Sequence, residues 1–68
     1  MFIIKWTNRH SNEEGYVESI SSKERHFVNT FDKASAKTYK TAVVANRMIS
    51  ALESYGEAKN NVFTLVEV

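Results

Sequence analysis

The side chains of this 68-residue chain that are most able to bind another molecule are basic and aromatic. Lys33, Lys37 and Lys40 follow one another at spacings of four and three, so they would share one side of a helix if this segment were helical. Basic residues interleaved with aromatic rings can contact phosphates and stack on bases. The candidate contacts to a partner or a nucleic acid are Lys5, Trp6, Arg9, Tyr16, Lys23, Arg25, Lys33, Lys37, Tyr39 and Lys40.

Residues that could support catalysis are few. The chain has no Cys, and its two histidines, His10 and His26, lie far apart without the ligand spacing of a zinc site. Glu13 and Glu14 lie near His10, but adjacent carboxylates in a polar loop are not expected to have the shifted pKa values that general acid–base catalysis needs. With only two glycines, the chain also lacks a glycine-rich phosphate loop. We therefore expect no enzymatic activity, no cofactor and no metal.

The charge of the chain bears on the class of partner. Nine Lys and Arg stand against eight Asp and Glu, which leaves a net charge of +1 and a pI of about 8.1. Domains that bind nucleic acids commonly have a pI above about 9. The charge balance therefore favours a protein partner and keeps nucleic acid as the alternative.

The length of the chain limits its stability. A domain of about 60 residues buries only about 60% of the surface of its unfolded chain, and no disulfide can form without Cys. No apolar run approaches the roughly 20 residues of a membrane span, and no signal peptide is visible. We expect one intracellular domain over residues 1–68 that depends on close packing, on self-association into a homodimer, or on a bound partner.

Alternation of apolar and polar residues predicts four short strands. They are expected at 2–7, 16–21, 26–31 and 62–68. Polar loops separate the first three strands and indicate an antiparallel meander. In the connector over 32–41, Asp32 is expected to cap a short turn that contains Ala34 and Ala36. A further loop is expected at 57–61.

One helix is predicted at 42–55, with Thr41 as its N-cap and Gly56 just beyond its end. Its wheel gathers six apolar residues within about 140°. These are Val44, Ala45, Met48, Ile49, Leu52 and Tyr55. Val43 is the one apolar residue outside this face, so the helix is expected to pack one side against a sheet.

The element order β-β-β-α-β predicts an α+β fold, a two-layer sandwich whose small, mostly antiparallel sheet is covered on one face by one helix. We expect the strand order 3-2-1-4, with the helix forming a crossover that makes the last strand parallel to the third and to the first. Nothing in the sequence remains to cover the other face of the sheet. That face is expected to present some of Ile3, Lys5, Thr7, Tyr16 and Val62, either as an interface or as an ordinary solvated surface.

Several segments resemble a recurrent layout. The stretch FDKASAKTYKT at 31–41, Ala45 in the helix, the closing Val-Glu-Val, the opening FIIK strand and the Gly15–Tyr16 pair are similar to small uncharacterised proteins from phages and prophages of low-GC Gram-positive bacteria. That family has no established activity, so the resemblance assigns no functional residues. It implies a viral or mobile-element setting in the cytoplasm of a bacterial host cell, where tiny noncatalytic proteins often bind and inhibit host machinery.

Two hypotheses of function follow. In the first, the chain is a noncatalytic accessory factor that binds a host protein and modulates it, for example as an inhibitor of an enzyme or a defence system. In the second, it binds DNA or RNA through Lys33, Lys37 and Lys40 and the nearby aromatic rings.

Overall fold

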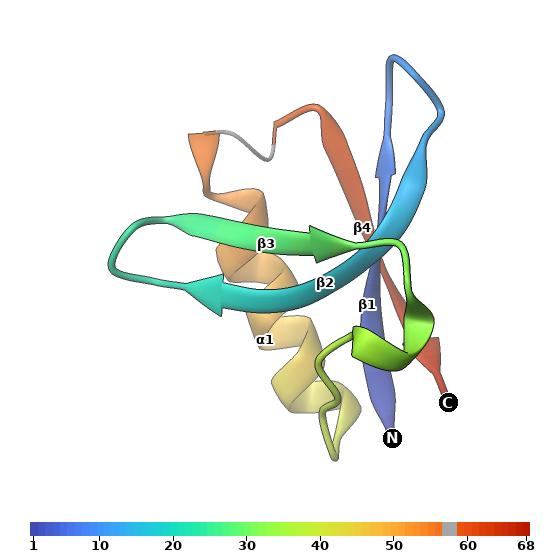
Figure 1. The fold of residues 1–68 in the computed structure, drawn as a ribbon. Helices are drawn as coiled ribbons and strands as arrows, with labels where there is room; N and C mark the ends of the chain where they lie inside the picture. The colour runs from blue at the N-terminus through green and yellow to red at the C-terminus, as the bar shows by residue number, and fades with distance from the viewer. Residues whose placement is uncertain (57–58) are drawn as a thin grey trace.

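The computed structural model describes residues 1–56 and 59–68 and confirms the predicted α+β class. The elements are β1 (Phe2–Asn8), β2 (Glu14–Ser21), β3 (His26–Thr30), the 3-10 turn η1 (Lys33–Ser35), α1 (Ala42–Glu53) and β4 (Asn61–Glu67), shown in Figure 1. The helix ends at Glu53, two residues before its predicted end, with Ser54 as its C-cap. The loop predicted at 57–61 lies partly outside the described residues.

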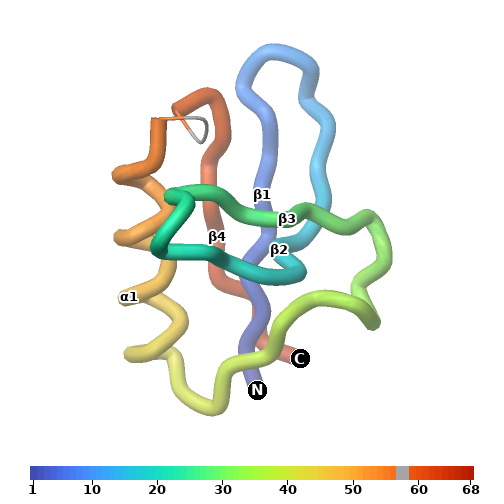
Figure 2. Tube along the Cα trace, turned by 60° about the vertical axis from the view of Figure 1, so that its left-hand side comes forward, coloured from blue at the N-terminus to red at the C-terminus, as the bar shows by residue number. Residues whose placement is uncertain are grey.

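The four strands form one sheet in the order β3-β2-β1-β4, as predicted, and all neighbouring pairs are antiparallel. β2 pairs with β1 only as far as Tyr16 and pairs with β3 from Tyr16 onward, with a register shift between Val17 and Ser19. Such irregularities bend a strand and increase its twist. In Figures 1 and 2 the β2–β3 hairpin therefore crosses β1 and β4 at a steep angle, and its turn reaches α1.

The predicted direction of the last strand is wrong, because β4 runs antiparallel to β1 over seven residue pairs. The reason lies in the connector between β3 and α1. Tyr39 pairs with Phe2 at the beginning of β1, so the helix starts beside that end of the sheet. A 12-residue helix rises about 18 Å, which brings the chain to the far end of β1. The chain can then join the edge of β1 only by running back along it.

The core lies between α1 and the inner face of the sheet, the face that the helix covers. Leu52, Ala45 and Tyr55 of the helical segment pack with Ile4, Trp6, Val17, Phe27, Tyr39 and Phe63. The rings of Phe27 and Phe63 meet edge-to-face with centroids 5.5 Å apart, an arrangement that aromatic pairs prefer. The predicted helical face is therefore confirmed in its main residues, although Val44, which the wheel places on it, is 42% exposed.

The caps that the sequence predicts are present. The Thr41 hydroxyl accepts the N–H of Val44 at 3.3 Å and begins α1, and the Asp32 carboxylate accepts the N–H of Ala34 at 3.0 Å and begins η1. Each cap satisfies a backbone donor that a helical turn leaves without an internal partner. Ala36, the C-cap of η1, and Thr41 both have extended backbone, with ψ of 141° and 151°, and they separate η1 from α1.

Gly15 allows β1 and β3 to approach β2 closely. A Cβ atom at this position would lie 2.8 Å from Cζ2 of Trp6 and 2.9 Å from the carbonyl oxygen of Thr30. The indole also donates a hydrogen bond from Nε1 to the carbonyl oxygen of Tyr16, at 3.2 Å. The absence of a side chain at Gly15 thus gives the indole ring room over β2.

We predict that Leu52→Ala lowers the free energy of unfolding by about 2–5 kcal/mol, because Leu52 is fully buried and the substitution leaves a cavity. Val43→Ala on the same helix is the matched control, since Val43 is 68% exposed and should lose almost nothing. Urea unfolding measures both. Equal stability of Leu52→Ala and the unmodified chain would contradict the packing of α1.

We predict that Gly15→Ala destabilises the fold by about 1–3 kcal/mol, because the new methyl group collides with an indole ring and a backbone carbonyl. Gly56→Ala provides the comparison, since a Cβ atom added at Gly56 would have no neighbouring atom within 4 Å. Thermal unfolding should therefore separate the two variants. If Gly15→Ala and Gly56→Ala unfold at the same temperature, the indole ring does not lie over Gly15 as described.

Candidate interaction surface

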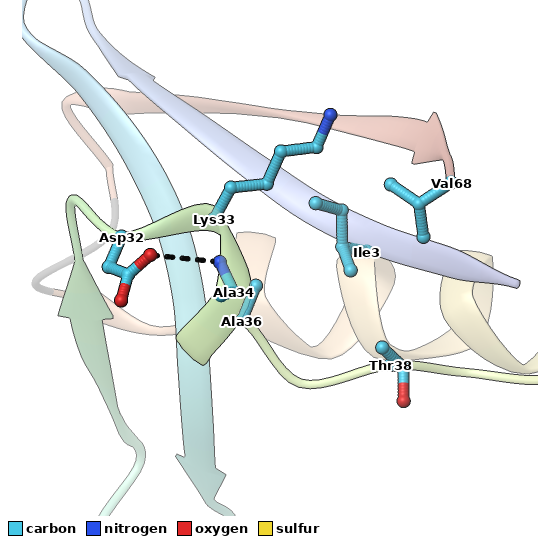
Figure 3. Close-up of a pocket in the computed structure, with 7 residues that line it drawn as sticks. All are labelled: Ile3, Asp32, Lys33, Ala34, Ala36, Thr38 and Val68. Carbon is cyan, nitrogen blue, oxygen red and sulfur yellow. Dashed lines mark hydrogen bonds between the residues drawn. The ribbon is translucent and has the colours of Figure 1, made fainter.

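A groove of about 530 Å³ lies on the outer face of the sheet, the face away from α1. One wall is formed by Ile3 of β1 and by Val68 after β4. The other wall is formed by the connector, where Asp32, Lys33, Ala34, Ala36 and Thr38 line the space. Figure 3 shows Ile3 and Val68 lying across from the two alanines. We call this space the η1 groove.

The lining of the η1 groove shows that the outer face is partly covered, whereas the sequence predicted that nothing would cover it. Ile3 is only 1% exposed, and Ala36 is also buried. The connector is held in this position by two backbone contacts, the N–H of Lys37 donating to the carbonyl of Val17 at 3.0 Å and the pairing of Tyr39 with Phe2. The small side chains Ala34 and Ala36 in an otherwise polar connector were the sequence signal for this cover.

The chemistry of the η1 groove suits binding of an apolar group. Its walls are aliphatic except for Thr38 and the charged pair Asp32 and Lys33. The Asp32 carboxylate is already engaged, because its two oxygens accept hydrogen bonds from the N–H of Ala34 and the hydroxyl of Ser35, at 3.0 and 3.2 Å. The groove therefore offers apolar walls with fixed polar groups beside them, the composition common in binding clefts.

The outer side chains of β4 continue the apolar surface next to the groove. Val62 is 40% exposed and Val68 is 52% exposed, and Val66 between them is half-buried. Lys5 and Glu14 form an ion pair of 3.1 Å on this face, with Tyr16 opposite Lys5 in the strand register. Because the pair is partly solvated, it contributes little to stability. The outer face thus presents Val62, Thr64 and Val66 along β4 and charged groups toward β2.

The lysines of the connector do not form a helical stripe. Lys33 lies in η1, which spans three residues only, and Lys37 and Lys40 follow in extended or bent chain. All three side chains are exposed. The prediction that the three lysines share one side of a helix is therefore wrong. The turn η1 ends with its C-cap Ala36, and the next helix begins only at Ala42.

Two of the candidate aromatic contacts are buried. Trp6 and Tyr39 belong to the core, where Trp6 contacts Gly15 and Tyr39 packs beside Phe2. Neither ring presents a face to a base. Phe31, which the sequence places in the third strand, instead follows β3, is 69% exposed and meets the indole edge-to-face at 5.9 Å.

The remaining candidates lie in the loops between strands. Arg9 and Lys23 are exposed, in the β1–β2 and β2–β3 loops. Arg25 has a left-handed backbone with φ of 54°, and its guanidinium donates to the carbonyl of Ser54 at 3.3 Å and lies 6.0 Å from the centroid of Tyr55. This side chain ties the β2–β3 turn to the end of α1. The ten candidates are therefore spread over the molecule and not gathered at one site.

The potential metal ligands among the described residues do not converge. Within residues 1–56 and 59–68, no group of three or more His, Cys, Asp or Glu side chains could hold a metal ion. Nε2 of His10 lies 3.2 Å from Oδ1 of Asn60, so this ring joins the first loop to the start of β4. In the same part of the chain, no helix combines the length and the apolar character required to cross a membrane.

Comparison with known proteins gave no match to a family model, a curated protein or a solved structure. The class that can be stated is thus a small α+β domain with a four-stranded antiparallel sheet and one packed helix. The resemblance to phage and prophage proteins stays a prediction.

Tyr39 provides a test of the core beside the groove. Its hydroxyl is buried without a hydrogen-bond partner among the described residues, and burial raises its pKa above the ordinary value. We predict that Tyr39→Phe is more stable by about 1 kcal/mol at neutral pH, because an unpaired buried hydroxyl is costly. Chemical unfolding measures the difference.

The pH dependence follows from the raised pKa of Tyr39. A raised folded-state pKa means that the fold holds the phenol proton more tightly than the unfolded chain does. Ionisation of Tyr39 therefore costs no stability below about pH 10, and stability falls as the pH rises further. The advantage of Tyr39→Phe should therefore grow in alkali. The half-buried Tyr16 gives a control, Tyr16→Phe, that should stay close to the unmodified chain at neutral pH. A marked loss of stability in Tyr39→Phe would contradict an unpaired hydroxyl.

Proposed function

We propose that this chain is a noncatalytic binding protein that docks another protein on the outer face of its sheet. The observation that supports the proposal is the η1 groove, an apolar space of about 530 Å³ bordered by the exposed Val68, which follows β4. Apolar clefts of roughly 300–1,000 Å³ are the usual size of binding sites. A groove of this kind accepts one or two apolar side chains from a partner.

The groove also has features that would orient a partner. Asp32 is held by two hydrogen bonds, so its charge has a fixed position, and the neighbouring Lys33 places an opposite charge beside it. Charges at the rim of an interface contribute more to specificity and association rate than to affinity. The apolar walls would then supply the affinity through burial of apolar surface.

The setting of this function is taken from the resemblance in the sequence. We propose that the chain acts in a bacterial host cell as a phage or mobile-element accessory factor, and that its partner is a host protein whose activity it modulates, as an inhibitor of an enzyme or a defence system. The small size fits this proposal, since 68 residues leave little volume beyond a core and one surface.

Nucleic-acid binding is the second candidate. The exposure of Lys33, Lys37 and Lys40 favours it, because lysines in contact with phosphates release counterions. The burial of Trp6 and Tyr39 weakens it, because base stacking requires an exposed ring face. Nucleic-acid binding therefore remains the alternative, and the capture experiment below distinguishes it from protein binding.

We predict that affinity capture from a bacterial lysate recovers a specific protein with the unmodified chain and loses it with Ala34→Glu. The substitution places a charge in the apolar wall of the η1 groove, at an exposed position where the fold should tolerate it. Ser50→Glu is the matched control, since Ser50 is exposed on α1 and should leave the capture unchanged.

The same eluates should be analysed for nucleic acid. Recovery of DNA or RNA that disappears when Lys33, Lys37 and Lys40 are changed to Glu would favour the alternative, and the loss should be greatest at low salt. Equal recovery of the protein by Ala34→Glu and the unmodified chain would contradict docking in the η1 groove.

A further inference from the structure

The two edges of the sheet differ in how they are protected. β3 at one edge has five residues and lies opposite the register shift in β2. β4 at the other edge has seven residues in unbroken register with β1, and its sequence NVFTLVE contains no Pro, Gly or Lys. Proteins usually blunt such edges with short strands, bulges, Pro or Lys, because a long regular edge pairs readily with another strand. β4 has none of these features.

The backbone groups that β4 turns outward follow from the hydrogen bonds of β1. Phe2 exchanges both of its backbone bonds with Tyr39, at 2.8 Å each, so it does not bond to β4. The N–H of Val68 instead donates to the carbonyl of Met1, and the N–H of Arg9 donates to the carbonyl of Asn60. Hydrogen-bonded pairs alternate along an antiparallel ladder, so odd-numbered residues of β1 bond to even-numbered residues of β4.

This alternation leaves four residues of β4 with N–H and C=O groups directed away from β1. They are Asn61, Phe63, Leu65 and Glu67. The set is symmetric about Thr64. A second β4 strand in antiparallel orientation, centred on Thr64, would place Phe63 opposite Leu65 and Asn61 opposite Glu67, and each such pair would exchange two backbone hydrogen bonds.

The side chains are also self-complementary in this register. On the outer face, the exposed Val62 would meet Val66 of the second copy, and Thr64 would meet its own equivalent. The one charged residue of the strand, Glu67, would face the amide of Asn61 and not a like charge. Pairs of β-branched and apolar side chains across strands stabilise a sheet. A register centred one residue away would place Glu67 opposite a different partner and break this match.

We propose that two copies of this chain form a dimer by antiparallel pairing of their β4 strands about Thr64, which joins the two sheets into one. The dimer uses the edge of β4 and is independent of the partner proposed for the η1 groove. The axis lies normal to the sheet, so both helices lie on the same face.

The mass in solution tests the dimer. The unmodified chain, of 7.8 kDa, should sediment with twice this mass. Thr64→Lys should sediment as a monomer, because the two new ammonium groups would face each other across the dimer axis and repel. The single chain should tolerate the substitution, since Thr64 is exposed. Asn29→Lys adds the same charge to the exposed surface of the β3 edge and should remain a dimer. A chain that stays monomeric at about 1 mM, a dimeric Thr64→Lys, or dissociation by Asn29→Lys would overturn the proposal.

Amide hydrogen exchange on the unmodified chain gives a second readout that does not depend on a variant. The amides of Phe63 and Leu65 point outward, so they should exchange more slowly at high than at low protein concentration. The amide of Thr64 bonds to β1 and should exchange at the same rate at both concentrations. Exchange at Phe63 and Leu65 that does not change with concentration would overturn pairing at β4.

Discussion

The mutual backbone hydrogen bonds between Phe2 and Tyr39, at 2.8 Å each, determine where α1 begins. They hold the connector against the start of β1, in the place that a longer β2 would occupy. From this position the helix covers the inner face and delivers the chain to the far end of β1. The antiparallel direction of β4 follows from this contact, and the cover over Ile3 depends on it together with the hydrogen bond from the N–H of Lys37 to the carbonyl of Val17.

The same contact bears on how far each of the two faces of the sheet is covered. The helix and the bent β2–β3 hairpin enclose Leu52, Phe27 and Phe63 in one core. On the outer face, the connector covers Ile3, while Val62 and Val68 stay exposed. A groove forms where the cover ends. The groove is thus a consequence of how few of the described residues cover this face of the sheet.

Local patterns predicted the elements well because their causes are local. The amphipathic spacing in α1 and the caps at Thr41 and Asp32 involve residues within one or two turns of each other. The strands near 2–7 and 62–68 follow from alternation along the chain. The candidate contacts were predicted less well, since residue type does not report exposure: Trp6 has a polar N–H and basic neighbours, yet its ring is buried over Gly15.

The sequence alone determined the element order, the helix and its buried face, the caps, and the strand order of the sheet. These depend on periodicity and on turn chemistry, which neighbouring residues carry. The tertiary structure decided the direction of β4, the burial of Ile3 and Tyr39, and the position of the η1 groove. Each of these depends on the pairing of Phe2 with Tyr39, 37 positions apart in the chain. A backbone hydrogen bond between two such distant residues has no periodic signature in the sequence, because any residue other than Pro can form it.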